Sequence, residues 1–209
     1  MAIPVGKTGK DIAFSRETHR EATHAPNRAY LAEYVRKNGV GAEIGVFWAH
    51  FSEVILKTFA PAKFYLVDPY HRLHGETYPA WGPYTDKGRL RVAETLDAAK
   101  AVRDSAPDVV ELREQFSTEF LAEMPVESLD WVYLDAGHKY EMVRDDLAAI
   151  LPRLKPDGVI LGDDYFADPN SAHGGVKQAV DEFAKAQGFE LIVGKYCQYV
   201  LRRPAAQTA

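Results

Sequence analysis

Short apolar runs alternate along this chain with segments of helical periodicity. The runs have the length and the β-branched or aromatic content of buried strands, and they span 41–46, 64–67, 109–112, 131–134 and 159–161. Amphipathic segments such as 88–102 separate them. Because parallel strands are joined through right-handed helical crossovers, the pattern predicts an α/β fold with a mostly parallel sheet covered by helices on both faces.

The 209 residues are enough for one substantial core, so we expect a single domain over 1–209. Within it we expect an N-terminal extension (1–25), a lid or substrate loop rich in aromatic residues (70–86) and a frayed tail (204–209). The segments 191–193 and 196–201 indicate a closing antiparallel pair of strands.

Local signals predict several element boundaries. Asn27 is expected to cap a helix that stops at Gly39, and Pro156, Asp157 and Gly158 are expected to turn the chain before the fifth strand. The helix after 131–134 is expected to bury Met142 together with its other apolar residues.

Composition narrows the partners and the compartment. Lys and Arg number 25 against 30 Asp and Glu, a net charge of −5 that argues against nucleic acid as the main partner. Cys197 is the one cysteine, which excludes an internal disulfide and a zinc site of several thiolates. Nowhere do 18 apolar residues run together, so we expect a cytoplasmic protein with a small-molecule partner and no membrane contact.

Polar residues gather where the strands end, and ligands of parallel sheets bind at those carboxyl ends. Gly45 follows the first strand, where it either admits a ligand close to the backbone or serves a tight turn. Asp68 follows the second strand and either accepts two hydrogen bonds from vicinal ribose hydroxyls or forms a turn before Pro69. The Gly-x-Gly-x-x-Gly spacing is absent, which disfavours a dinucleotide.

A specific resemblance rests on motifs in order along the chain. They are Glu43-x-Gly45, Asp68, Leu134-Asp135-Ala136-Gly137-His138-Lys139-Tyr140-Glu141, Leu154-Lys155-Pro156-Asp157-Gly158 and Gly162-Asp163-Asp164-Tyr165. Over about 27–203 the chain resembles class I S-adenosylmethionine-dependent methyltransferases, and within them the small-molecule O-methyltransferases of the catechol and macrocin type.

The resemblance implies a Rossmann-like, doubly wound sheet of seven strands in the order 3-2-1-4-5-7-6, with the last strand antiparallel. It also implies that S-adenosylmethionine is bound by Glu43 and Gly45 at its methionine part and by Asp68 at its ribose, with Asp135 close by. Phe116 and Ser117 would contact the adenine.

The same resemblance implies a magnesium ion held by Asp135, Asp163 and Asp164, since hard divalent cations prefer carboxylate oxygens. His138 stands where the catechol branch has a lysine base, and a histidine there could accept a proton near neutral pH. Two plainer readings stay open. His138 could cap the next helix or shape the pocket, and Asp163 and Asp164 could be a solvated strand end.

Ala49 and Phe51 depart from the family's pattern of a second glycine followed by serine, so Ser52 or a backbone N–H would have to replace a contact to the cofactor. His71, His74 and His173 lie in loops near the expected mouth, where a substrate role stays open.

Three functions remain. The first is a magnesium-dependent O-methyltransferase acting on a phenol, sugar or natural-product hydroxyl, the second is a metal-independent methyltransferase that relies on His138, and the third is a non-catalytic nucleoside-binding module. Dimerisation is compatible with enzymes of this kind.

Overall fold

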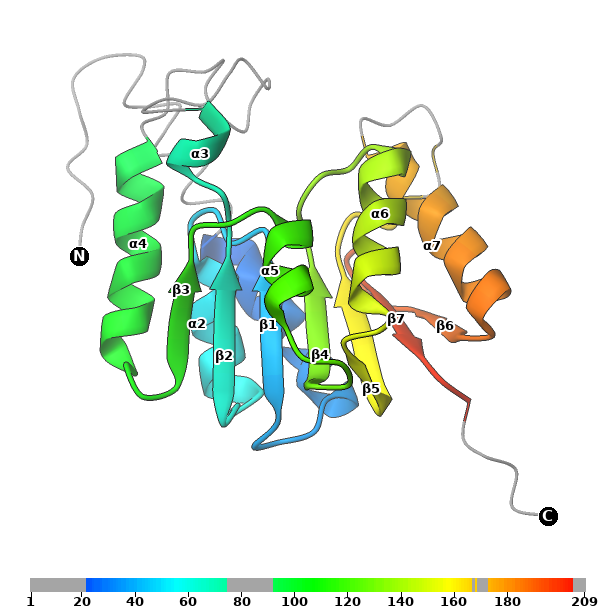
Figure 1. The fold of residues 1–209 in the computed structure, drawn as a ribbon, viewed down its shortest axis with the longest axis horizontal. Coiled ribbons are helices and arrows are strands. Elements are labelled where there is room, and N and C mark those ends of the chain that lie inside the picture. Colours follow the sequence, from blue (N-terminus) through cyan, green and yellow to red (C-terminus); the bar gives the residue numbers. More distant parts are fainter. Residues whose placement is uncertain (1–21, 75–91, 167, 169–172, 205–209) are drawn as a thin grey trace.

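Seven strands form one sheet in the order β3-β2-β1-β4-β5-β7-β6 in the computed structural model, which describes residues 22–74, 92–166, 168 and 173–204. Neighbours among the first five strands are parallel, and β7 is antiparallel to both β5 and β6 (Figure 1). This confirms the predicted fold class. The strands are β1 (Val40–Ile44), β2 (Lys63–Val67), β3 (Val110–Arg113), β4 (Leu129–Leu134), β5 (Leu154–Gly162), β6 (Glu190–Val193) and β7 (Tyr199–Arg202).

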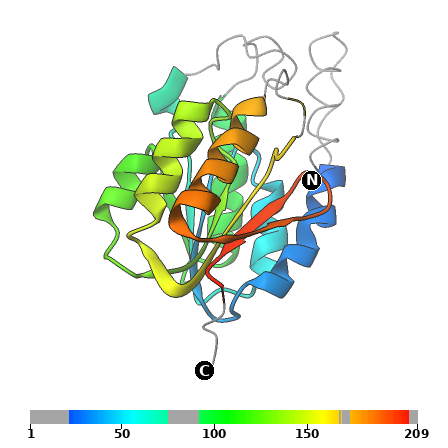
Figure 2. The same cartoon turned by 90° about the vertical axis from the view of Figure 1, so that its right-hand side faces the viewer.

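Helices cover both faces because the central strands are apolar on both sides, as in β4, where every residue is buried. One core joins the sheet to η1 (Ala25–Tyr34), α2 (His50–Thr58) and α4 (Val92–Ser105). The other joins it to α5 (Ser117–Glu123), α6 (Tyr140–Ile150) and α7 (Gly174–Gln187). Figure 2 shows the sheet between these two layers. A short helix, α3 (His71–His74), follows β2.

Three local predictions were wrong. The first helix is a 3-10 helix that starts at Ala25, with Pro26 in its first turn, so Asn27 is not its cap. Met142 is half exposed because it packs over Gly137, where an added Cβ would lie 2.2 Å from its Cε, and not into the core. The Pro156–Gly158 segment stays inside β5 as an irregularity in its pairing with β4, and Arg203 binds the carbonyls of Lys155 and Pro156.

The expected lid starts with α3, and its remainder, 75–86, lies outside the described residues, as do 1–21 and 205–209. None of the described helices is long and apolar enough to span a membrane.

The sheet reverses its winding between β1 and β4, and this is where ligands of such sheets bind. Gly45, directly after β1, has a φ of 90°, and a Cβ built on it would lie 1.9 Å from the carbonyl oxygen of Asp135. The glycine therefore brings the ends of β1 and β4 into backbone contact. The close approach that Gly45 permits in this structure is that of the Asp135 backbone.

Gly45→Ala should lower the free energy of unfolding by more than about 2 kcal/mol, because it adds both a left-handed strain and a clash with the Asp135 carbonyl. Gly188→Ala is the matched control, since its φ of 68° is also left-handed but no atom lies within 4 Å of the added Cβ. It should cost only about 1 kcal/mol. Urea unfolding measures both, and equal losses would contradict the role given to Asp135.

Candidate active site

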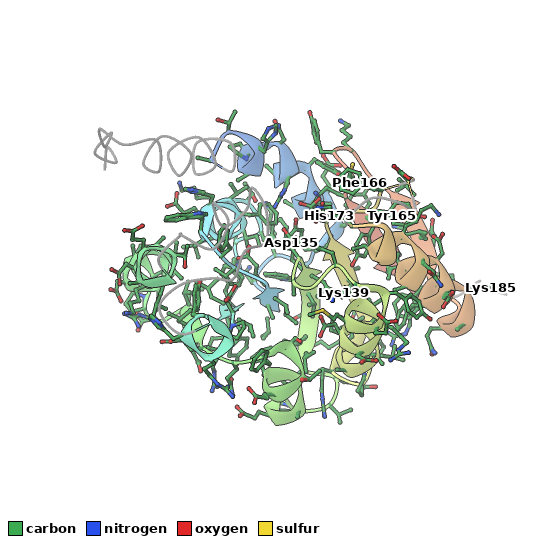
Figure 3. All side chains as sticks on the ribbon, turned by 90° about the horizontal axis from the view of Figure 1, so that it is seen from above. Asp135, Lys139, Tyr165, Phe166, His173 and Lys185 are labelled. Atoms are coloured by element: carbon green, nitrogen blue, oxygen red, sulfur yellow. The ribbon has the colours of Figure 1, made fainter. Side chains whose placement is uncertain are left out.

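Three carboxylates meet at the carboxyl ends of β4 and β5, as the sequence predicts. Leu134 and Gly162 are paired in the sheet, so the residues that follow them, Asp135 and Asp163, lie side by side. Asp164 comes next and adopts a left-handed conformation, with φ at 60°. Figure 3, seen from above, shows Asp135 near the centre of this edge with His173 close to it.

Arg28, from η1, reaches into this cluster. Its guanidinium forms an ion pair with Asp163 and lies 3.4 Å from Asp135, and its side chain is only 14% exposed. It also stacks over the Phe51 ring, 5.4 Å from the ring centroid. Sequence reasoning missed this residue, because nothing local marks an arginine whose partners lie more than a hundred positions further along the chain.

Both carboxylate oxygens of Asp163 are bound by other groups of the protein. Arg28 binds one oxygen, while the side-chain amide of Gln198 and the backbone N–H of Asp164 donate to the other. Gln198 in turn accepts a hydrogen bond from the Tyr133 hydroxyl at 3.0 Å. Burial raises the pKa of Asp163, the Asp135 carboxylate raises it further, and Arg28 opposes both.

His138 lies in the loop after β4, and its Nε2 is 2.9 Å from Asp164 and 3.6 Å from Asp135. His173, the N-cap of α7, approaches the same oxygen of Asp164 with its Nδ1 at 2.9 Å. The sequence left the role of His173 open, and its neighbour Gly175 explains its position. An added Cβ there would lie 2.6 Å from the carbonyl oxygen of His138, so α7 packs directly on this loop.

The protonation of His138 differs from the sequence expectation. Burial by itself would lower the pKa of His138, but Asp135 and Asp164 outweigh it and raise the pKa to about 10. For Asp135, burial works toward a higher pKa, and His138 and Arg28 outweigh it and lower the value. The helix-capping alternative for His138 is also wrong, because Lys139 is the N-cap of α6.

The residues expected to bind the cofactor lie around β1, β2 and α5. Glu43 is buried within β1 and accepts a hydrogen bond from Ser52, and burial raises its pKa to about 8. Ser52 is therefore committed to Glu43 and does not replace the missing loop serine. Phe51 is buried in the core, so this departure from the family pattern is a packing change.

Asp68 braces the loop after β1. Its carboxylate accepts backbone N–H groups of Val46 and Phe47, both at 3.1 Å, and of Tyr70 at 3.0 Å. Burial raises the pKa of Asp68, although the three hydrogen bonds act to lower it. A carboxylate offers roughly four acceptor positions, so one remains for a ribose hydroxyl.

Phe116 and Ser117 begin α5, beyond the end of β3. Phe116 is partly exposed and lies under the guanidinium of Arg72, which pairs with Glu119 at 2.5 Å. The Ser117 hydroxyl donates to Asp146. An adenine contact for these two residues stays a prediction.

Solved structures of other proteins have a similar fold. The solved structure of a Corynebacterium glutamicum protein matches with a TM-score of 0.65 at 15% identity, covering 97% of this chain and 94% of that one. An O-methyltransferase family protein from Burkholderia thailandensis matches with a TM-score of 0.62 at 13% identity, covering 95% of this chain and 61% of that one. The O-methyltransferase NovP matches with a TM-score of 0.53 at 17% identity, covering 88% of this chain and 79% of that one. No curated protein sequence matches the chain.

Fold and site thus define a class I S-adenosylmethionine-dependent methyltransferase. The sequence profile of the methyltransferase-domain family matches residues 40–165, more than half of the chain, and the protein belongs to that family.

Magnesium, which the sequence resemblance implies, does not fit the residues as they are arranged. Mg²⁺ needs near-octahedral oxygen ligands at about 2.0–2.1 Å. Arg28 stands between Asp135 and Asp163, both oxygens of Asp163 are used, and two imidazoles flank Asp164. The positive charge that the ion would bring is supplied by the chain.

The imidazole of His138 should titrate near pH 10, as followed by proton NMR of the full chain. Asp164→Asn should lower that pKa, because one of the two carboxylates that stabilise the imidazolium is lost. The pKa of His138 is higher in the folded protein than its unfolded value of about 6.5. The ion pairs of His138 with Asp135 and Asp164 therefore contribute their full stabilisation below about pH 6.5, and that contribution is lost as the pH rises through about 10. Asp157→Asn, at an exposed position, should change nothing, and a wild-type value near 6.5 would contradict the assignment.

Proposed function

We propose that this protein is an O-methyltransferase that transfers the methyl group of S-adenosylmethionine to a hydroxyl of a small molecule. The observation that carries the proposal is the His138 imidazole, held between Asp135 and Asp164 at the ends of β4 and β5. Two proteins of similar fold, NovP and the Burkholderia protein, are described as O-methyltransferases, which supports the choice of oxygen. The acceptor class is a small molecule, in keeping with the net charge of −5.

S-adenosylmethionine supplies an electrophilic methyl group on a sulfonium sulfur. In the proposal, Asp68 accepts a ribose hydroxyl with its remaining lone pair, Glu43 and Gly45 border the methionine part, and Phe116 offers an exposed ring to the adenine. Ser117 and Asp135 complete the expected set. Asp68 also fixes the loop at Val46 and Phe47, so cofactor binding and loop conformation depend on one carboxylate.

His138 has the task of moving the acceptor's proton. A protonated alcohol or phenol is a weak nucleophile, and a positioned base contributes about 10²- to 10⁴-fold. The neutral imidazole of His138 accepts the proton, and the Asp164 carboxylate, 2.9 Å from Nε2, stabilises the imidazolium that results. Because the carboxylates raise the pKa of His138 to about 10, the neutral form is a minority at neutral pH and transfer accelerates with pH.

Arg28 has an electrostatic task. Its guanidinium keeps Asp135 and Asp163 in place without a divalent ion. The proposal is therefore the metal-independent form of the enzyme, and magnesium dependence becomes an outcome of the test.

His138→Gln should lower kcat by about 10²- to 10⁴-fold while leaving the dissociation constant of S-adenosylmethionine nearly unchanged. The assay follows formation of S-adenosylhomocysteine with a panel of phenols, catechols and sugars, and calorimetry gives the binding. His24→Gln, at an exposed position at the start of η1, is the control and should behave like wild type. Binding of the cofactor without turnover on any acceptor would favour the nucleoside-binding module.

Transfer by the wild-type protein should persist in EDTA, because Arg28 already neutralises the carboxylates. Arg28→Ala should lower kcat at least tenfold, while Arg36→Ala, which changes an exposed residue, should not. Loss of activity in EDTA and its return with Mg²⁺ would overturn the role of Arg28 and restore the magnesium-dependent form.

A further inference from the structure

Two imidazole nitrogens and one carboxylate oxygen converge beside the ion pairs of Arg28. Nε2 of His138, Nδ1 of His173 and an oxygen of Asp164 all lie within 4.8 Å of one another. Neither histidine belongs to the all-carboxylate set that the sequence resemblance implies for magnesium. We propose that His138, Asp164 and His173 form a binding site for a first-row transition-metal ion such as Co²⁺ or Zn²⁺.

The distances suit such an ion. Each imidazole nitrogen is 2.9 Å from the same oxygen of Asp164. Two ligand atoms that each lie about 2.05 Å from a metal are about 2.9 Å apart in an octahedral site and about 3.3 Å apart in a tetrahedral one. A carboxylate with two imidazoles in neighbouring positions is the arrangement of facial metal sites that keep other positions open.

The orientation of His138 supports the same reading. Its Nε2 is buried and lies 2.9 Å from Asp164 and 3.6 Å from Asp135, so an ion that binds there takes the place of the imidazolium proton. The nitrogen is aimed into the space that it shares with Asp164 and His173, as a metal ligand would be.

The three donors are held by different elements of the fold. His138 follows β4, Asp164 follows β5 in its left-handed conformation, and His173 caps α7. The packing of Gly175 against the backbone of His138 and Tyr140 fixes α7 on the loop. The backbone positions of the three donors are therefore fixed before an ion binds, which reduces the entropic cost of binding.

The donor chemistry distinguishes this ion from magnesium. Imidazole nitrogens suit Zn²⁺, Co²⁺ and Ni²⁺, whereas Mg²⁺ prefers oxygen. The Asp135 carboxylate, 3.6 Å from Nε2 of His138, adds negative charge on the same side, and Arg28 binds the other oxygen of Asp135.

Metal binding would regulate the active site. An ion coordinated by Nε2 of His138 lowers the basicity of the ring and takes the place of its ion pair with Asp164, so the loaded protein should transfer methyl groups more slowly. This consequence rests on the proposed function, whereas the site itself does not.

Untagged, metal-free full-length protein is titrated with Co²⁺ and followed by visible absorption and X-ray absorption. The expected result is saturation at one ion per chain with two imidazole ligands, unaffected by a hundredfold excess of Mg²⁺. His173→Ala and Asp164→Asn should each weaken binding at least tenfold, and His24→Ala should not. Thermal unfolding verifies that each variant is folded.

Absence of Co²⁺ binding by the wild type, a spectrum of oxygen ligands only, or unchanged affinity in folded His173→Ala would overturn the site. Zn²⁺ should slow methyl transfer by the wild type at least tenfold relative to its metal-free rate. In His173→Ala, Zn²⁺ should have a much smaller effect relative to the metal-free rate of that variant. If no acceptor is methylated at all, the proposed function fails while the Co²⁺ titration still decides the site.

Discussion

Burial of carboxylates at the carboxyl end of the sheet is the constraint on which the rest of this structure depends. An ionised carboxylate removed from water is costly unless it is paired or hydrogen-bonded. The chain meets this cost differently at each strand: Glu43, with its pKa raised to about 8, is mostly protonated at neutral pH and bonded by a hydroxyl, backbone N–H groups donate to Asp68, and a guanidinium binds Asp163. Each solution fixes a neighbouring segment, so the loops around the site take their shape from the acids they surround.

Much of this framework could be predicted from the sequence. The alternation of apolar runs and amphipathic helices is a local pattern, and it led to the correct fold class. The convergence of Asp135 with Asp163 and Asp164 could be predicted because parallel strands end at one edge. His138 follows Asp135 at the same edge, and its role as a base was what the family resemblance implied.

The rest depends on contacts between residues far apart in the chain. Arg28, His173 and Gln198 carry no local signal of their partners, since each reaches the site only through the packing of its own helix or strand. The pKa of His138 could not be inferred for the same reason, because it is set by Asp135 and Asp164 together. The burial of Met142 was predicted wrongly because helical periodicity gives no information on its contact with Gly137, which has no side chain to keep Met142 away.

Arg28 and Gln198 meet at Asp163 from nearly opposite ends of the described chain. The site is therefore closed by the first helix and by the segment just before the last strand, while the sheet between them supplies only its acids. During synthesis, almost the whole chain must therefore be made before Asp163 can contact both Arg28 and Gln198. A cut that removes Arg28 with the first helix would thus damage the chemistry of the site while every strand of the sheet stays in the chain.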